Sequence, residues 1–446
     1  AGWTTEKFFL LRDLLKNYLP AGETLPAVPA ALPVIEIPEF HFHKVAPLFS
    51  NLPEAKQTVD IQPMEQFNQG WGTILYRTTL PETTLAGTTL KITEVHDWAQ
   101  IYADGKLLAR LDRRKGEFTT TLPALKKGIQ LDILVEAMGR VNFDKSIHDR
   151  KGITEKVELI SGNQTKELKN WTVYNFPVDY SFIKDKKYSD TKILPTMPAY
   201  YKSTFTLDKV GDTFLDMSTW GKGMVWVNGH AMGRFWEIGP QQTLFMPGCW
   251  LKEGENEILV LDLKGPTRAS IKGLKKPILD VLREKAPETH RKDGEKLKLT
   301  GEKVVHEGAF TPGNGWQEVR FATPVKGRYF CLEALSPQAN DNIAAIAEFD
   351  VLGVDSKPVS REHWKIRYAD SEETRSGNRT ADKIFDLQES TFWMTVDNVP
   401  YPHQLVIDLS KVENVTGFRY LPRAEKGYPG MIKEYRVYVK PADFNY

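Results

Sequence analysis

The chain has 446 residues, too many for one hydrophobic core, and this length predicts about three domains. Its 59 Lys and Arg almost balance its 58 Asp and Glu, so no overall charge favours nucleic acid or anionic lipid as a partner. Two cysteines, Cys249 and Cys331, cannot build a disulfide framework, and no apolar run approaches the roughly 20 residues that span a bilayer. The first residue is Ala1 rather than Met, which predicts a processed or cut start.

The chain opens with an amphipathic helix that is followed by a proline-rich segment. Apolar residues recur at helical spacing within residues 3–19, and Pro20 ends the pattern. Prolines at 20, 26, 29, 33 and 38 predict an extended linker, so residues 25–69 are expected to hold this linker and the first strands. His41 and His43 share one face of that segment, but with no third ligand nearby they are expected to be ordinary surface side chains.

An internal repeat predicts two similar β-domains. Residues 76–80 (YRTTL) recur about 125 positions later as residues 201–205 (YKSTF), and residues 98–106 (WAQIYADGK) recur at nearly the same offset as residues 222–230 (KGMVWVNGH). In each copy an apolar strand runs into an Asp-Gly or Asn-Gly hairpin turn. The sequence leaves open whether strands from 34–60 join the second of these domains.

A basic, proline-containing segment over residues 266–299 follows the second β-domain. Such a charge run serves either as a solvated linker between domains or as a patch for an acidic polymer, and the linker is the favoured interpretation.

The last 150 or so residues carry two blocks of strand-like sequence. Residues 381–386 (ADKIFD), 402–409 (PHQLVIDL) and 432–439 (IKEYRVYV) resemble the first half of a discoidin-like domain of the coagulation factor 5/8 type C family. Residues 328–334 (RYFCLEA) and 344–351 (AAIAEFDV) resemble the second half, which in that family follows the first.

Neither half can bury its strands alone. We therefore expect one circularly permuted sandwich, in which residues 300–353 pair with residues 361–446. The alternative, two truncated domains, would leave sheet edges exposed.

Residues 221–263 (GKGMVWVNGHAMGRFWEIGPQQTLFMPGCWLKEGENEILVLDL) resemble the carboxy-terminal jelly-roll segment of family 35 β-galactosidases. The resemblance implies an all-β chain of tandem galactose-binding-like jelly-roll sandwiches and a discoidin-like sandwich, after a short helix left from a TIM barrel. The expected domains are the barrel helix (1–24), the linker and first strands (25–69), two jelly rolls (70–190 and 191–265), the basic linker (266–299) and the discoidin-like domain (300–446).

The resemblance also bears on function. The family's two catalytic glutamates, which must lie about 5 Å apart on a rigid scaffold, are not expected in this chain, because its only Asn-Glu pair, Asn256-Glu257, falls in a turn. We therefore expect the accessory region of a secreted bacterial β-galactosidase, periplasmic or extracellular, whose partners are the missing TIM-barrel portion and galactose-containing glycans. The alternatives are a stand-alone galactose- or glycan-binding or adhesion protein and a purely structural scaffold.

Candidate site residues follow from the same resemblance. A sugar site needs an aromatic face and fixed polar groups. In the expected discoidin loops the candidates are Trp393, His403, Arg419, Arg423 and Tyr428. The motif around Trp393 is usually core, and an arginine such as Arg423 more often pairs within the fold, so a structural role is favoured for these two. In the jelly-roll motif a structural role is expected for Trp226, Asn228, Gly229, Arg234 and Trp236. No cofactor is expected beyond a structural calcium ion, for which Asp386 and Glu348 are the matching carboxylates.

Overall fold

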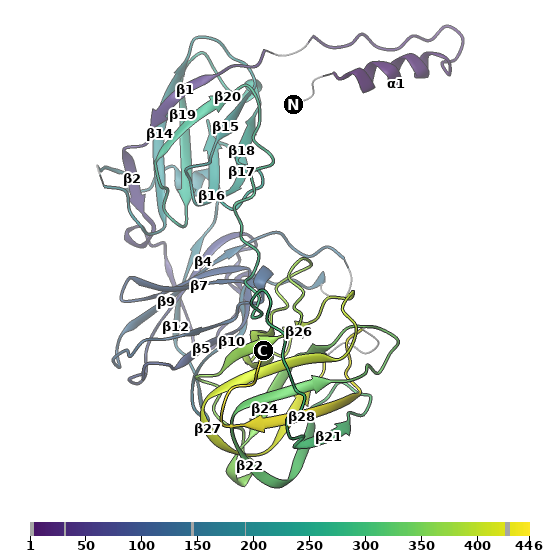
Figure 1. The fold of residues 1–446 in the computed structure, drawn as a ribbon. Coiled ribbons are helices and arrows are strands. Elements are labelled where there is room, and N and C mark those ends of the chain that lie inside the picture. The colour runs from purple at the N-terminus through teal and green to yellow at the C-terminus, as the bar shows by residue number, and fades with distance from the viewer. Residues whose placement is uncertain (1–3, 31–32, 144–146, 192, 424–428) are drawn as a thin grey trace. The chain divides into compact units, whose positions relative to one another are not determined.

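The structure is a computed structural model that describes all residues except 1–3, 31–32, 144–146, 192 and 424–428 (Figure 1). The described chain is mostly β-strand, as predicted, and it divides into two compact units. The first unit comprises Ala1–Pro53 and Pro177–Lys285, and the second comprises Glu54–Phe176 and Ala286–Tyr446. Helix α1 (Glu6–Lys16) lies within the predicted helical segment, and none of its residues is buried.

The first unit contains a sandwich of two antiparallel sheets. The larger sheet has the order β13 (Ser189–Asp190), β2 (Lys44–Pro47), β14 (Ala199–Leu207), β19 (Gly254–Asp262), β16 (Lys222–Val227) and β17 (His230–Trp236). The smaller has the order β1 (Ile37–His41), β20 (Ser270–Leu274), β15 (Thr213–Asp216) and β18 (Thr243–Met246). Trp220 lies in the core between them, with the ring of Phe42 edge-on at 5.0 Å and that of Tyr201 edge-on at 5.1 Å.

One open question is answered and two expected boundaries change. Strands β1 and β2 belong to this sandwich, which answers the question left open for residues 34–60. Strand β20 falls inside the segment predicted as a basic linker, because its buried Ile271 completes the smaller sheet. Residues 180–190, expected in the first jelly roll, hold the short helix α2 (Tyr180–Ile183) and β13, which pairs with β2.

The second unit contains a sandwich with the same plan. Its six-stranded sheet has the order β3 (Ala55–Thr58), β12 (Trp171–Phe176), β4 (Gly72–Thr79), β9 (Gln130–Ala137), β6 (Trp98–Ala103) and β7 (Lys106–Asp112). Its four-stranded sheet has the order β11 (Gln164–Glu167), β10 (Gly152–Ser161), β5 (Thr89–His96) and β8 (Thr119–Thr121).

The repeated segments occupy equivalent places in the two sandwiches. Strands β4, β9, β6 and β7 are neighbours in one sheet, in the same order as β14, β19, β16 and β17 in the other. Both hairpin turns need left-handed backbone, with φ of 43° and 78° at Asp104-Gly105 and of 49° and 87° at Asn228-Gly229. Asp, Asn and Gly tolerate this conformation, and they are the residues that the repeat places there.

The rest of the second unit is a discoidin-like sandwich whose main sheet draws strands from both blocks. Its order is β21 (His306–Ala309), β28 (Glu434–Lys440), β22 (Gln317–Ala334), β27 (His403–Leu421) and β24 (Glu348–Leu352), with β25 (Lys365–Ala369) also on β27. Strands β23 (Ala345–Ile346) and β26 (Trp393–Met394) form a small second sheet. Segments 300–353 and 361–446 therefore alternate in one sheet, which argues against two truncated domains. The permuted order relative to the family stays a prediction.

Short 3-10 helices complete the described elements. They span Leu48–Ser50, Met64–Phe67, Arg113–Lys115, Gly248–Trp250, Val354–Ser356 and Ala381–Phe385. No described helix is long and apolar enough to cross a membrane.

Candidate functional site

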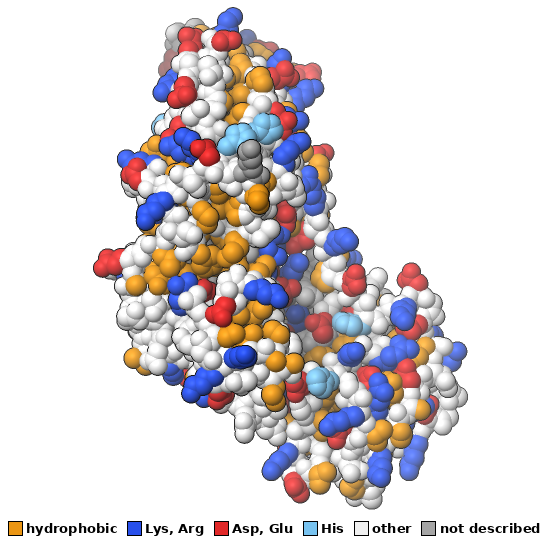
Figure 2. All heavy atoms as spheres, turned by 90° about the vertical axis from the view of Figure 1, so that its left-hand side faces the viewer, with side chains coloured by type: hydrophobic (Ala, Val, Ile, Leu, Met, Phe, Trp, Pro, Cys, Tyr) orange, Lys and Arg blue, Asp and Glu red, His pale blue; other side chains and the backbone are white. Residues whose placement is uncertain are grey.

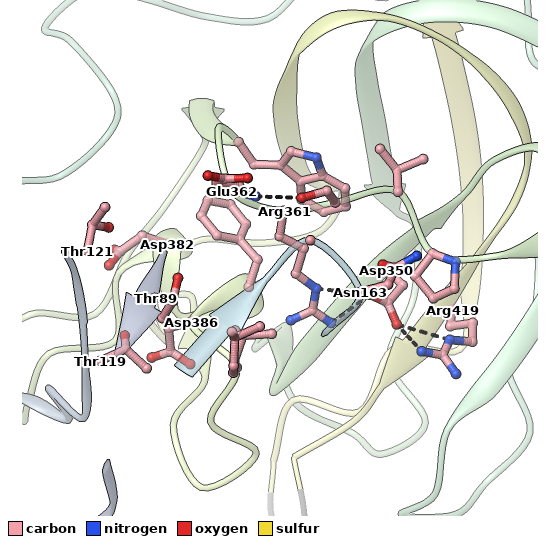
Figure 3. Close-up of a pocket in the computed structure, with 18 of the residues that line it drawn as sticks. Thr89, Thr119, Thr121, Asn163, Asp350, Arg361, Glu362, Asp382, Asp386 and Arg419 are labelled. Carbon is pink, nitrogen blue, oxygen red and sulfur yellow. Dashed lines mark hydrogen bonds and ion pairs between the residues drawn. The ribbon is translucent and has the colours of Figure 1, made fainter. Parts of the chain in front are cut away.

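A polar cleft of about 640 Å³ lies in the second unit, lined by both of its sandwiches (Figure 3). We call it the Trp316 cleft. The jelly-roll side contributes threonines and an asparagine: Thr89 from β5, Thr119–Thr121 of β8 and Asn163 from the β10–β11 turn. The β-branched threonines suit strands, and they present hydroxyl groups that both donate and accept hydrogen bonds.

The discoidin-like side contributes two arginines fixed by one buried aspartate (Figure 3). Asp350 on β24 accepts a hydrogen bond from Arg361 Nε at 2.9 Å and another from Arg419 Nε at 3.0 Å. Asp350 and Arg419 face each other across β24 and β27, so the sheet register itself sets this pair. Burial opposes the charge of Arg361, but Glu348 and Asp350 outweigh it and raise the arginine's pKa. Asp350 therefore fixes the positions of both guanidinium groups.

Trp316 supplies the aromatic surface of the cleft. Its side chain is 37% exposed, and the guanidinium carbon of Arg419 lies 4.7 Å from the ring centre. The indole Nε1 donates to Glu389 Oε1 at 3.4 Å. The cleft thus combines an accessible aromatic ring with oriented guanidinium and hydroxyl groups. An aromatic ring can pack on the apolar face of a sugar, and such polar groups can hydrogen-bond to its hydroxyls.

Carboxylates stand at the other end of the cleft. Asp382 is partly exposed, whereas Asp386 is largely buried at the C-terminal end of the short helix Ala381–Phe385. Asp386 Oδ2 accepts from Thr391 Oγ1 at 2.7 Å, and its Oδ1 accepts from the Gln388 amide at 3.0 Å. Burial, together with the nearby charge of Glu348, raises the pKa of Asp386 to about 8.

The two carboxylates expected to hold calcium already face cations: Arg361 contacts Glu348 Oε2, and Lys383 Nζ lies 3.8 Å from Asp386 Oδ2. What points to a further cation is the remaining oxygen of Glu348. Glu348 Oε1 is buried and has no hydrogen-bond partner among the described residues, and the pKa of Glu348 is raised by burial. Two buried carboxylates that repel each other favour either protonation or a cation. Among the described residues, no group of three or more His, Cys, Asp or Glu side chains is arranged to hold a metal ion, so other ligands would be neutral oxygens. Thr391 Oγ1 and the Gln388 carbonyl, 2.9 Å apart, are such oxygens beside Asp386.

The structure separates the five predicted sugar contacts. Trp393 is core, with its Nε1 donating to the Ser371 carbonyl at 3.0 Å. His403 is also buried, with Nδ1 2.8 Å from Asp370 Oδ2. The burial of Trp393 agrees with the core role favoured for its motif, whereas His403 is a correction, because a side chain buried in the core cannot contact a glycan. Arg419 lines the Trp316 cleft, whereas Arg423 is on the ring of Phe392, 4.3 Å from its centre. The fifth, Tyr428, lies outside the described residues.

Sequence reasoning missed Trp316 and Arg361. Trp316 ends the glycine-rich run Pro312–Gly315, and a large aromatic in a turn rather than in a strand is the signal that could have found it. Arg361 carried no such signal, because its partners Glu348 and Asp350 come together only through β24.

The jelly-roll motif residues lie in and around the sandwich of the first unit. Trp226 is buried, and Asn228 Nδ2 donates to the Trp250 carbonyl at 2.9 Å. Gly229 occupies the left-handed turn position, and Arg234 lies on β17. Trp236 packs its ring against Lys222 Nζ at 4.2 Å from the ring centre.

The Asn256-Glu257 pair has structural partners. Asn256 is buried, and its amide nitrogen donates to the Lys252 carbonyl at 2.8 Å. Glu257 Oε1 accepts from Tyr180 Oη at 2.7 Å. Asn256 thereby connects β19 to the loop before it, and Glu257 connects β19 to α2.

The folds define a class of protein, a chain of tandem β-sandwich modules. Family comparison agrees. Residues 62–177 match the first all-beta domain of β-galactosidase, residues 198–256 match the β-galactosidase galactose-binding domain, and residues 368–446 match the F5/8 type C domain. The resemblance to the non-catalytic β-domains of β-galactosidases, joined to an F5/8 type C domain, is therefore confirmed.

Several β-galactosidases are similar to this chain in sequence. Beta-galactosidase 1 of Dictyostelium discoideum is 31% identical over 298 residues, which cover 59% of this chain and 43% of the relative. A beta-galactosidase of Xanthomonas manihotis is 34% identical over 247 residues, covering 55% of this chain and 40% of the relative. A beta-galactosidase of Bos taurus is 32% identical over 337 residues, covering 65% of this chain and 48% of the relative. The chain thus spans less than half the length of these relatives.

Proposed function

We propose that this chain is the accessory region of a periplasmic or extracellular β-galactosidase and that its Trp316 cleft binds the galactose-containing glycan. In this proposal the two catalytic glutamates belong to a TIM-barrel portion, which acts on terminal β-galactosides while this region holds the chain of sugars. The matched β-galactosidase domains support the accessory role.

The observation that carries the binding site is the partly exposed Trp316 ring beside the fixed guanidinium of Arg419. A galactose ring has one apolar face of C–H groups that can lie on an indole ring, while its hydroxyls take hydrogen bonds from the arginine. Thr119–Thr121 stand on the opposite side to receive further hydroxyls. The cleft volume, about 640 Å³, is large enough for a short oligosaccharide.

Calcium has a structural place in the proposal. Bound by Asp386 and Glu348, with neutral oxygens completing its shell, the ion would cancel the repulsion between the two carboxylates. Because Asp386 also lines the Trp316 cleft, the ion would fix one end of the sugar site.

Helix α1 offers a contact for the missing barrel portion. Its apolar residues Leu10, Leu11, Leu14 and Leu15 are all at least half exposed. An apolar helix face of this kind is stable when another domain covers it.

The sugar-site proposal is tested by isothermal titration of the whole chain with galactose-terminated oligosaccharides. Trp316→Ala should weaken binding at least tenfold, about 1.4 kcal/mol. The matched control is Trp71→Ala, because Trp71 is similarly exposed (45%) in the same unit but does not line the cleft. Equal affinities for the two variants would refute the assignment of the site.

The choice between an accessory region and a stand-alone adhesion protein needs a second measurement. Native mass spectrometry of the protein from its source organism should show this chain joined to, or bound by, a segment of barrel size that hydrolyses a chromogenic galactoside. A chain that travels alone and lacks that activity would favour the adhesion protein.

A further inference from the structure

A second cleft, of about 340 Å³, lies in the same unit and shares none of the Trp316 cleft's lining residues. Four cationic side chains and one acidic side chain line it, and we call it the basic cleft. They are Arg113, Arg114, Lys115, Arg379 and Glu94. An excess of cationic groups around a concave site favours an anionic ligand.

The sequence places three of these cations on one turn. Residues Arg113–Lys115 form a single 3-10 turn after β7, capped by Asp112, whose side chain accepts from the Arg114 amide at 3.0 Å. Gly116 ends the turn at φ 61°, and a Cβ there would lie 2.7 Å from Thr391 Cγ2. The turn is therefore held against the discoidin-like loop that forms the other side of the cleft.

Acidic groups orient two of the cations from outside the cleft lining. Arg113 donates to Asp149 Oδ1 at 2.7 Å, and Arg114 donates to Asp112 Oδ2 at 2.6 Å. The lining carboxylate, Glu94, is itself 2.8 Å from His96 Nε2, and this hydrogen bond lowers its pKa. These pairs fix the positions of the side chains.

Arg379 differs from these arginines. Its guanidinium carbon lies 4.1 Å from the ring centre of Phe392, and among the described residues it forms no ion pair with a carboxylate. The guanidinium of Arg423 lies 4.3 Å from the same ring centre. Burial and the like charge of Arg423 lower the pKa of Arg379. A half-buried arginine beside a second arginine is costly unless an anion neutralises it.

We propose that the basic cleft binds an oxyanion carried by a glycan, either a sulfate ester or the carboxylate of a uronic acid. The planar guanidinium of Arg379 matches two oxygens of such a group at once. Ser376, Asn378 and Ser390 line the same cleft and can donate to the remaining oxygens. The glycan part of this inference rests on the proposed function, whereas the anion site rests on the arginines alone.

The test is isothermal titration of the whole chain with three ligands: a neutral galacto-oligosaccharide, its sulfated form and an oligomer of galacturonic acid. At low salt, one or both acidic ligands should bind at least tenfold more tightly than the neutral one, and the difference should shrink in about 0.5 M salt. Binding of only one acidic ligand identifies the group recognised. Equal affinity for all three would overturn the proposal.

Variants assign the effect to the cleft. Arg379→Gln should lose at least tenfold for the acidic ligand and leave the neutral ligand unaffected, and Lys115→Gln should act in the same direction without disturbing the Phe392 contact. The control is Arg320→Gln on β22, whose arginine is 43% exposed and paired with Glu318. An equal loss in this control would mean general charge attraction and would overturn the site.

The outcomes also separate the two proposals. If only neutral binding and its dependence on Trp316 fail, the Trp316 cleft is refuted while the anion site stands. If acidic and neutral ligands bind alike through Trp316, the anion site is refuted while the Trp316 cleft stands.

Discussion

The charge cluster inside the jelly roll of the second unit should be the most sensitive point of that sandwich. Lys151 is 0% exposed, and its Nζ donates to Asp97 Oδ2 and Asp149 Oδ2, each at 2.7 Å, and to the Gly139 carbonyl at 3.0 Å. Lys151→Met keeps the length of the side chain but removes the charge between two buried carboxylates. Arg113 remains close to both, at 2.8 Å from Asp97 and 2.7 Å from Asp149, so the compensation is lost only in part.

Breaking a buried ion pair from one side costs about 3–5 kcal/mol. The structure gives a second figure. Burial opposes ionisation of Asp149, but the hydrogen bond from Lys151 and further donors outweigh it and lower its pKa to about 2, from an ordinary 3.8. At about 1.4 kcal/mol per pH unit, this shift corresponds to about 2–3 kcal/mol, shared among Lys151, Arg113 and the Val141 amide. The contribution is present above pH 4 and is lost as the pH falls through about 2, because the carboxylate is then protonated.

The assay is native-state hydrogen exchange of the whole chain, read on peptides from β6 and β9, because chains with several domains do not unfold in one step. Lys151→Met should lower the opening free energy there by about 3 kcal/mol at pH 7. The matched control is Lys156→Met, whose lysine is 44% exposed and pairs with Glu158, and whose loss should cost less than about 1 kcal/mol. Indistinguishable exchange in the two variants would refute this reasoning.

Three further predictions test other parts of the structure. Calcium should raise the melting temperature of the discoidin-like domain in the wild type and not in Asp386→Asn; a shift in both would place the ion elsewhere. Gly223→Ala should lower the opening free energy of β16 and β19 in hydrogen exchange by more than about 2 kcal/mol, because its Cβ would lie 1.7 Å from the Leu261 carbonyl oxygen. Gly313→Ala meets no atom within 4 Å and should be nearly neutral. Burial opposes the charged form of His290, but the hydrogen bond and charge of Glu372 outweigh burial and raise the pKa of His290. Amides around residue 290 should therefore be better protected from hydrogen exchange at pH 6 than at pH 9. This protection is complete below the unfolded pKa and is lost as pH rises through the folded one; Glu372→Gln should remove the difference, and a difference that persists would contradict the pairing.

The charged side chains of both signs are mixed on the surface. Figure 2 shows Lys, Arg, Asp and Glu side chains interspersed over the face in view, as the near-zero net charge suggests. The binding proposed for the two clefts therefore depends on local arrangements of side chains rather than on an overall field.

The sequence by itself determined the β-class, the repeat and its turns. The Asp-Gly and Asn-Gly pairs specify left-handed backbone at Asp104-Gly105 and Asn228-Gly229, and such turns are local, so they can be read without the fold. The motif around Trp226 was read correctly as strand and turn for the same reason.

Only the tertiary structure decided which strands pair and which aromatic rings reach solvent. Strand β1 pairs with β20, more than 200 residues away, and no local pattern selects such a partner. Trp393 and Trp316 both lie near strand ends. Trp393, on β26, is buried where β26 pairs with β23, whereas Trp316 is partly exposed beside Arg419. Burial depends on the neighbouring sheet, and that sheet is assembled from segments that the sequence keeps far apart.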